Sequence, residues 1–442
     1  MAWFTRFVNS MRPRLPNDER GRMRAVANNL ILHLHPTRVP APALQMRRTW
    51  GLGGISALLT VILVLSGILL MFRYDASIER AYQSIQFLET AVPFGSLLRA
   101  IHHWSGNLLV ITVTLHLVRV FFTGGFYGPR RSNWIFGLAL LLLVLFFNFT
   151  GYLLPWDQLA FWAITVGVGL LDYVPLLGEA MATFLLGGRE VGQAALRNFY
   201  ALHVAVLPAL LMLMLSYHFW RVRKDGGIAL PTPSGPVEKL TTIPHLVGIE
   251  LGVALLTLTA LLGFAMLVPA PLEELANPAH PPNPAKAAWY FLGLQELLLH
   301  MHPLAAMLLS GSVMLGLAAV PYWDRDEAAI GIVGRSARGR EAGLVGFLLS
   351  LLITPSLVVI DEWWLDLPSL LPTWSTLITN GVLPLALSLA GLALIYALLR
   401  YPLRARPSEA LVGLFSFIGG ALVVLTVVGV FLRGPDMVLM WP

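Results

Sequence analysis

The sequence predicts an all-α integral membrane protein, in which a four-helix bundle is followed by about five further transmembrane helices. Two observations predict this class. Hydrophobic residues make up 57% of the 442 residues and charged residues only 12%, and the mean hydropathy is +0.72, as expected of a polytopic membrane protein and not of a soluble one. In addition, nine segments are long and apolar enough to cross a hydrocarbon layer of about 30 Å.

Polar, Gly-rich or Pro-rich connections separate the nine predicted spans. We expect the spans at residues 50–72, 99–122, 134–154, 200–221, 245–268, 299–321, 343–361, 377–399 and 409–432. They define a basic arm (1–48), a four-helix N-terminal domain (49–230), a three-helix domain (231–365) and two additional helices (366–442). No cleavable signal peptide is expected, because the Arg-rich arm has no short apolar core followed by a cleavage site.

Positive charge predicts the orientation. If the N-terminus lies on the negative side of the membrane, 23 of the 30 Lys and Arg residues lie on that side, in connections or at helix ends. The positive-inside rule favours this topology. The formal net charge of +6 therefore reflects the membrane topology and gives no reason to expect a nucleic-acid partner. The chain has no Cys, which excludes disulfides, iron–sulfur ligation and thioether attachment of haem by this chain.

Two of the predicted spans carry paired histidines. His102 and His116 are 14 residues apart, and His203 and His218 are 15 apart. At about 100° per residue the second ring of each pair returns to within roughly 40° or 60° of the first, about 21 Å along the axis. Since imidazole is a haem ligand, two such helices facing each other would hold two stacked haems. A lone intramembrane His often only bonds a neighbouring helix, but four at matched depths favour ligation.

Glycines in the first and third spans repeat at the same interval. Gly53 and Gly67 are 14 residues apart, as are Gly137 and Gly151. A residue without Cβ permits the close backbone approach that a flat porphyrin edge needs. We therefore expect these glycines to form notches beside the haems.

The two histidine-bearing helices run in the same direction, which fixes the ligand pairs. We expect His102 with His203 near the positive side and His116 with His218 near the negative side. Arg99 and Arg119 each lie three residues from a ligand. Two readings stay open for them: binding of haem propionates by charge-assisted hydrogen bonds, or snorkelling from the helix ends.

Two connections, 155–199 and 269–298, are longer than a turn requires. Long ordered loops are usually functional, so we interpret them as a lid and a partner-docking surface. The alternative is ordinary interfacial loops whose Trp and Tyr belong to the aromatic belt.

The segments around these histidines resemble the cytochrome b/b6 family. They are Arg99-Ala-Ile-His102-His-Trp-Ser-Gly106, Gly151-Tyr-Leu-Leu-Pro-Trp-Asp-Gln158 and Phe199-Tyr-Ala-Leu-His203-Val-Ala-Val-Leu-Pro208. The 15-residue interval and the following Arg223-Lys224 resemble the plastid and cyanobacterial branch. The resemblance is specific over 30–230 and weaker over 240–365, which is similar to the separate second subunit of that branch. Beyond about 365 the helices are generic.

The resemblance implies the membrane core of a quinol:cytochrome c oxidoreductase with two non-covalent b-type haems. Quinol would be oxidised near the positive side, with one electron passing to a Rieske iron–sulfur protein. The other would cross to a quinone-reduction site, and protons would be translocated. The implied partners are a c-type cytochrome subunit, the quinone pool and a second copy of the complex. The implied location is an energy-transducing bacterial inner membrane.

The chain departs from the family at two positions. Gly51 stands where the b6-like branch carries the Cys that attaches an extra haem, so no covalent haem is expected on this chain. The family's Pro-Glu-Trp-Tyr reads Ala287-Ala288-Trp289-Tyr290 here, so the implied proton acceptor is missing. We expect Glu296, eight residues after Ala288, to replace it as a buried carboxylate with a raised pKa, and Trp289 and Tyr290 to belong to the same catalytic site. The alternative is a structural Glu296 packed against Gln295 or His300.

At the negative side, Arg223, Lys224 and Asp225 end the fourth span and are candidates for quinone binding. The alternative is a stop-transfer cluster. His33 and His35 are weaker candidates.

Two rival functions fit part of the pattern. One is a di-haem membrane anchor that links the quinone pool to a dehydrogenase or hydrogenase, although such anchors usually have fewer helices. The other is a haem-free transporter or scaffold, which leaves the glycine spacing unexplained and would show no b-type absorbance.

Overall fold

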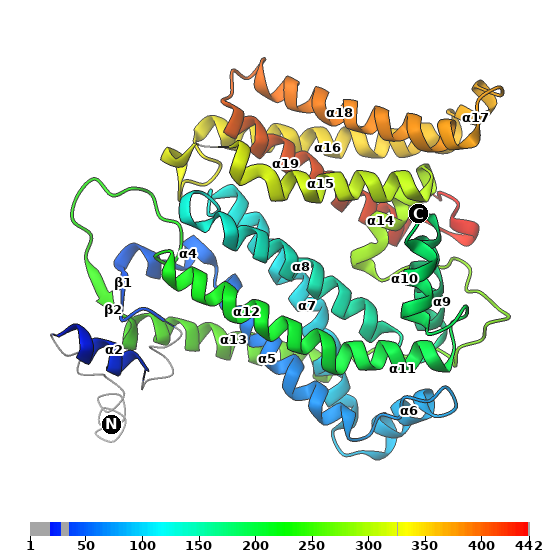
Figure 1. Ribbon diagram of the computed structural model, residues 1–442, viewed down its shortest axis with the longest axis horizontal. Helices are drawn as coiled ribbons and strands as arrows, with labels where there is room; N and C mark the ends of the chain where they lie inside the picture. Colours follow the sequence, from blue (N-terminus) through cyan, green and yellow to red (C-terminus); the bar gives the residue numbers. More distant parts are fainter. Residues whose placement is uncertain (1–17, 28–34, 325, 441–442) are drawn as a thin grey trace.

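The computed structural model describes residues 18–27, 35–324 and 326–440. Within these ranges nine helices are long and apolar enough to span a membrane, and Figure 1 shows them running across the molecule. The predicted all-α membrane fold is confirmed. Seven spans contain α5 (Leu52–Met71), α7 (Gly95–Phe122), α8 (Arg131–Tyr152), α13 (Val247–Leu267), α15 (Pro303–Trp323), α16 (Ala337–Trp363) and α18 (Leu383–Arg400). The fourth joins α11 (Gln193–Ala201) to α12 (Leu207–Lys224), and the last contains α19 (Pro407–Val427).

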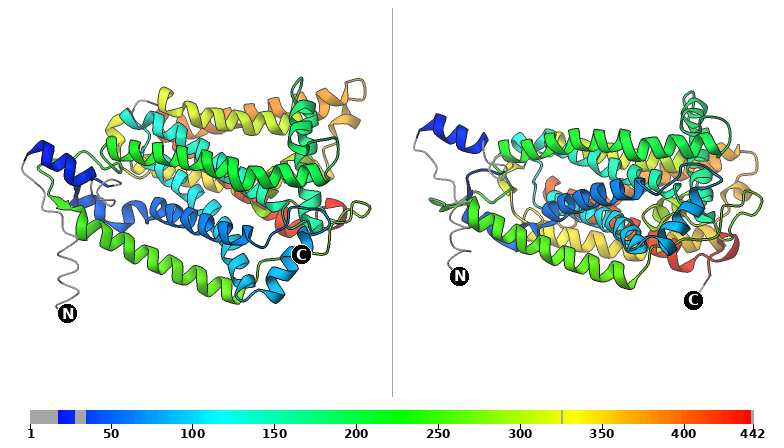
Figure 2. Two further views of the ribbon diagram at one scale, coloured as in Figure 1. Left: turned by 60° about the horizontal axis from the view of Figure 1, so that its bottom comes forward. Right: turned by 90° about the horizontal axis from the view of Figure 1, so that it is seen from below.

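The ends of the spans define two faces of the molecule. We call the end that carries residues 35–51 and 225–241 the arm face, where β1 (Arg38–Pro40) pairs antiparallel with β2 (Lys239–Thr241). We call the opposite end, which carries the connections 72–94, 153–192 and 268–302, the loop face. Figures 1 and 2 show these ends on opposite sides, with the described C-terminal residues on the loop face.

Short helices build the loop face. They are α6 (Ala81–Ala91), α9 (Gln158–Gly169), α10 (Gly178–Leu186), α14 (Trp289–His300) and α17 (Leu367–Leu370). Asp157 begins α9, where its side chain accepts a hydrogen bond from the backbone of Ala160, as an N-cap residue does. The sixth span starts at Pro303 and not at 299, because α14 uses residues up to His300.

A π-helical turn at Leu202–Val206 interrupts the fourth span. Pro208 follows it, and proline has no N–H to donate to the carbonyl four residues back, so the chain widens locally. The turn contains His203 and takes up one additional residue of the interval to His218. It thereby offsets the longer interval between these two histidines, which the sequence alone predicted would leave them about 60° apart.

The last span packs closely on α16 through small residues. A Cβ on Gly346 would collide with the carbonyl oxygen of Gly413, and one on Gly420 would collide with the hydroxyl of Ser350. Small residues allow membrane helices to approach closely. Close approach increases the dispersion contacts between the helices, which matter because lipid provides no hydrophobic driving force for their association. The last span also contacts α14, because Gly293 lies against Leu422. It is therefore an integral part of the loop-face structure.

Candidate functional site

The four histidines singled out by spacing come together in the N-terminal bundle. The ring centroids of His102 and His203 lie 6.3 Å apart. His116 and His218 follow on the same two helices, toward the arm face. α5 packs on α7, and α8 packs on α12, so each glycine-bearing helix lies beside a histidine-bearing one.

Each of the four glycines faces one of the four histidines. The shortest distances from histidine Cε1 to the position that a Cβ would occupy are 3.2 Å for His102 and Gly67, 3.5 Å for His116 and Gly53, 2.6 Å for His203 and Gly151, and 3.8 Å for His218 and Gly137. The notch at each glycine therefore receives the edge of an imidazole ring. The tightest notch, at Gly151, leaves no room for any side chain.

Two hydroxyls orient the rings nearest the loop face. Ser66 Oγ lies 2.9 Å from Nδ1 of His102, and Thr150 Oγ1 lies 3.1 Å from Nδ1 of His203. Each hydroxyl also donates to a backbone carbonyl of its own helix. Since a hydroxyl has one proton to give, Nδ1 must be the donor to it. This fixes the tautomer that leaves the Nε2 lone pair free for a metal.

The loop-face pair fits a haem. Two opposed imidazoles, each with a metal–nitrogen bond of about 2 Å, would have ring centroids roughly 6 Å apart. The observed 6.3 Å agrees with this separation. At the arm-face pair, Nδ1 of His218 is buried and has no hydrogen-bond partner among the described residues.

The two predicted propionate arginines have protein partners. The buried Arg99 pairs with Glu89 and donates to the carbonyl oxygen of Ala270 at 3.0 Å. Arg119 donates from Nε to the carbonyl oxygen of Arg48 at 2.8 Å. Both arginines join separate segments at the two ends of α7, a role that neither sequence reading anticipated.

The arm face carries the other predicted quinone-site residues. Asp225 pairs with Arg221 at 3.1 Å, and Lys224 Nζ lies 4.6 Å from the centre of the Trp220 ring. Arg223 lies in the last turn of α12, which ends at Lys224. His35 lies 3.1 Å from Glu250, and His33 lies outside the described residues.

Several arginine nitrogens at the arm face are buried without a hydrogen-bond partner. The Nε atoms of Arg48, Arg130 and Arg221 have no hydrogen-bond partner among the described residues. Buried polar groups are normally satisfied. This end of the bundle therefore offers donors to an anionic or carbonyl-bearing group.

A second element of the site is a cavity of about 200 Å³ at the loop face. Its walls are α8, α9, residues 282–288 and α14. Phe149, Trp162, Leu170 and Leu294 represent its mainly apolar lining, and Tyr152, Tyr290, Lys286 and Gln295 are its polar residues. Phe149 and Tyr152 line the cavity from α8, and Gly151 lies between them in sequence on another face of the helix, so the cavity and the notch for His203 lie at the same end of α8.

Trp289 and Tyr290 lie in different surroundings. Tyr290 lines the cavity, and burial raises the pKa of its phenol, so it is a neutral hydrogen-bonding group. Trp289 does not line the cavity. Its Nε1 donates to Oδ1 of Asn107 at 2.7 Å, which ties the start of α14 to α7.

Glu296 lies outside the cavity lining, completely buried. Arg433 Nη2 is 2.6 Å from its Oε1, and His300 Nε2 is 3.2 Å away. Burial alone would raise the pKa of Glu296, but the hydrogen bonds from His300 and Arg433 outweigh burial and hold it below its usual value. The expectation of a raised pKa was wrong, because Arg433 was not anticipated and His300 was considered only as a packing neighbour and not as a cation.

His300 extends this cluster toward solvent. Its Nδ1 lies 2.6 Å from Asp361. Burial opposes the charged imidazolium, but the bonds to Asp361 and Glu296 raise the pKa of His300 to about 9. The predicted alternative contact of Glu296 with His300 is thus present. Gln295, in contrast, turns to the loop and accepts from the Ala287 backbone N–H at 2.7 Å.

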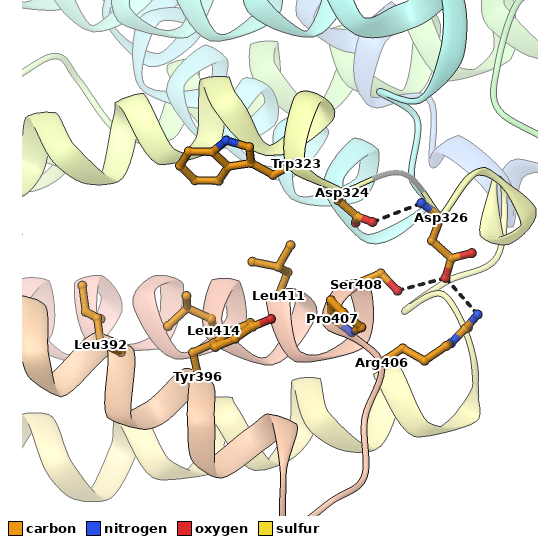
Figure 3. Close-up of a pocket in the computed structure, with 11 residues that line it drawn as sticks. Trp323, Asp324, Asp326, Leu392, Tyr396, Arg406, Pro407, Ser408, Leu411 and Leu414 are labelled. Atoms are coloured by element: carbon orange, nitrogen blue, oxygen red, sulfur yellow. Dashed lines mark hydrogen bonds and ion pairs between the residues drawn. The ribbon is translucent and has the colours of Figure 1, made fainter.

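A larger cleft of about 780 Å³ lies between α15, α18 and α19. Figure 3 shows Asp326 at its polar end, bonded to Arg406 and Ser408, with Trp323 and Tyr396 along its apolar part. Among the residues that the structure describes, none of the predicted site residues lines this cleft.

Sequence reasoning missed several residues that shape the site. Ser66 and Thr150 directly precede Gly67 and Gly151, so a repeated hydroxyl–glycine pair was the available signal. Arg433 was also missed. Its signal was a single basic residue directly after an apolar span, on the side where few basic residues are predicted.

Comparison with known proteins gives consistent matches. Residues 38–226 match the family described as Cytochrome b/b6/petB. Cytochrome b6 of Synechococcus elongatus is 41% identical over 175 residues, which are 40% of this chain and 81% of that protein. Cytochrome b6 of Acaryochloris marina is 36% identical over 209 residues, 47% of this chain and 94% of that protein. A solved structure described as a hyperthermophilic respiratory Complex III has a similar fold, with a TM-score of 0.64 and 21% identity over 89% of this chain and 92% of that chain.

Proposed function

This chain belongs to the cytochrome b/b6 family, and from that premise we propose that it is the cytochrome b subunit of a bc-type quinol:cytochrome c oxidoreductase. Membership of the family implies b-type haem and electron transfer within a membrane. The observation that carries the proposal is the set of four histidines, each seated against a glycine of the neighbouring helix.

The four histidines are the proposed ligands of two haems. His102 with His203 would hold one near the loop face, and His116 with His218 would hold the other near the arm face. When bound, the haems supply one-electron transfer along the axis of the bundle. The chain contributes the Nε2 lone pairs, the glycine notches and an apolar surround.

The loop-face cavity is the proposed site of quinol oxidation. A quinol is a flat apolar ring with two oxygens, which suits an apolar cavity with a few polar groups. Tyr152 and Tyr290 are hydrogen-bonding groups in its wall. The cavity and the His203 notch both lie at the loop-face end of α8, so a ring bound there would lie near the His102–His203 pair, as electron transfer requires.

Glu296 stays our candidate for the proton acceptor that the chain lacks at Ala288. Glu296 is bonded to Arg433 and His300 on a side of α14 that does not line the cavity. It could therefore accept a proton only after these hydrogen bonds rearrange. The His300–Asp361 contact would then lead a proton toward solvent, because Glu296 is buried and the Asp361 side chain is 37% exposed.

The arm face is the proposed site of quinone reduction. Arg223, Lys224 and Asp225 lie at the end of the helix that carries His218. The buried arginine nitrogens beside them support binding of a carbonyl oxygen or a haem propionate.

The proposed partners follow from the family and from what this chain cannot supply. Without Cys the chain has no ligands for an iron–sulfur cluster, so a Rieske protein and a c-type cytochrome would come as separate subunits. We also infer a homodimeric complex in an energy-transducing bacterial inner membrane, in contact with the quinone pool and with the arm face on the negative side. We expect no nucleic-acid partner.

A redox titration of the purified complex with pyridine haemochrome quantification tests the proposal. We expect two b haems per chain with separate midpoint potentials, no covalently retained haem, and quinol-dependent reduction of cytochrome c. One haem or none would refute the ligand assignment. Two haems without quinol oxidation would refute the oxidoreductase and favour a membrane anchor.

A further inference from the structure

The end of the last span contacts two walls of the loop-face cavity. Lys286, which lines the cavity, donates from Nζ to the carbonyl oxygen of Val430 at 2.9 Å. Asn283 exchanges two hydrogen bonds with Asp436: its Nδ2 donates to Oδ1 at 2.7 Å, and its Oδ1 accepts from the backbone N–H at 2.5 Å. The loop that forms one wall is thus bonded to residues about 150 positions further along the chain.

Arg433 lies at the centre of these contacts. Its side chain is 1% exposed, and each of its guanidinium nitrogens has a hydrogen bond. Nε and Nη2 donate to the Glu296 carboxylate, while Nη1 donates to Glu362 and to the carbonyl oxygen of Met437, both at 2.8 Å. A buried ion pair is costly to desolvate unless further hydrogen bonds complete it, and this one is complete. The guanidinium therefore holds α14, the end of α16 and the C-terminal residues in one arrangement.

The same turn of α14 is tied on its other side to the loop. Gln295, next to Glu296, accepts from the Ala287 backbone N–H and donates to the Ala285 carbonyl oxygen, both at 2.7 Å. Gln295 lines the cavity and Glu296 does not. A shift of Glu296 would therefore rotate Gln295 and move the loop that it holds.

We propose that Arg433 is a positioning residue for quinol oxidation, which fixes α14 through Glu296 and so sets the width of the loop-face cavity. This inference rests on the proposed function of that cavity. Arg433 does not touch the cavity and acts through Glu296, Gln295 and the loop.

The test uses the whole complex with Arg433→Lys. Lysine keeps the charge but cannot bond Glu296 through two nitrogens while reaching Glu362. Arg406→Lys is the matched control, because Arg406 pairs with Asp326 at the opposite end of the same span. We expect the KM for a short-chain quinol analogue to rise on the order of tenfold with Arg433→Lys. The haem content and the haem midpoints should stay near those of the wild type.

A wild-type KM, or an equal rise with Arg406→Lys, would overturn the proposal. A fall in kcat without a change in KM would also overturn it, because it would indicate loss of assembly or of a catalytic group. If Arg433→Lys does not assemble, Asn283→Ala is used instead, because it removes the two exposed hydrogen bonds between the loop and Asp436. A rise in KM then supports the proposal, and an unchanged KM overturns it. Failure of the proposed function is distinct, since the wild-type complex would then oxidise no quinol.

Discussion

The Cε1 atom of His203 lies 2.6 Å from the point where a Cβ would stand on Gly151. Gly137 on the same helix faces His218 at 3.8 Å, an ordinary van der Waals contact. The two notches of α8 therefore differ in the space they leave for a side chain at the glycine, although their spacing in the sequence makes them look equivalent.

Replacement of Gly151 by Ala should displace the His203 ring and disturb the loop-face haem. We expect Gly151→Ala to lose or shift one of the two b-type bands in reduced-minus-oxidised spectra. Gly137→Ala should retain both bands, because its methyl group fits without movement. Equal spectra for the two variants would contradict the notch geometry.

Loss of the Ser66 hydroxyl should change the potential of the loop-face haem. The hydroxyl accepts from Nδ1 of His102 and makes the imidazole a stronger donor, which favours the oxidised iron. We expect Ser66→Ala to raise the midpoint by about 20–60 mV, which corresponds to one hydrogen bond. Ser56→Ala on the same helix is the control, since Ser56 bonds Leu52 and Thr112 and no histidine. A lower or unchanged midpoint would argue against this role.

Replacement of Glu296 by Gln should slow quinol oxidation more than tenfold and leave the haem spectra intact. A pH–rate profile separates the two possible causes. If Glu296 accepts the proton, an acidic limb of the profile disappears with Glu296→Gln; if it only supports Arg433, the limb stays. Glu250→Gln, at the arm face, is the control. Turnover at the wild-type rate would exclude both roles.

The charged state of His300 should stabilise the complex below alkaline pH. Its pKa is raised to about 9 in the folded protein, so its contribution is complete below the unfolded value near 6.5 and is lost as the pH rises through 9. We expect thermal stability in detergent to fall between pH 7 and 10, by up to about 3 kcal/mol.

His300→Gln should flatten this alkaline decline, and His280→Gln, at an exposed position of the loop face, should not. A decline that persists unchanged in His300→Gln would assign the effect to another group.

Patterns of period and length predicted the membrane fold and the placement of the four histidines. Nine spans follow from apolar length, and the bounds at α5 differ from the prediction by two residues or fewer. Histidine and glycine spacing predicted which helices meet, because ligand and notch repeat at the same helical interval.

Contacts between distant segments could not be predicted in this way. The partners of Glu296 lie 137 positions away at Arg433 and four positions away at His300, and only the nearer one was considered. Arg99 likewise pairs with Glu89 and bonds the remote Ala270. Side-chain partners across a fold depend on helix packing, on which the hydrophobic pattern of a single span carries little information.

The π-helical turn at Leu202–Val206 also bears on how such chains are compared with one another. A π-helical turn at a ligand can accommodate one inserted or deleted residue. The number of residues between two ligands can then change during evolution while both side chains keep their positions. A search that demanded equal intervals on both helices would discard this chain. Counting turns of helix, and not residues, is the sounder criterion for recognising distant relatives.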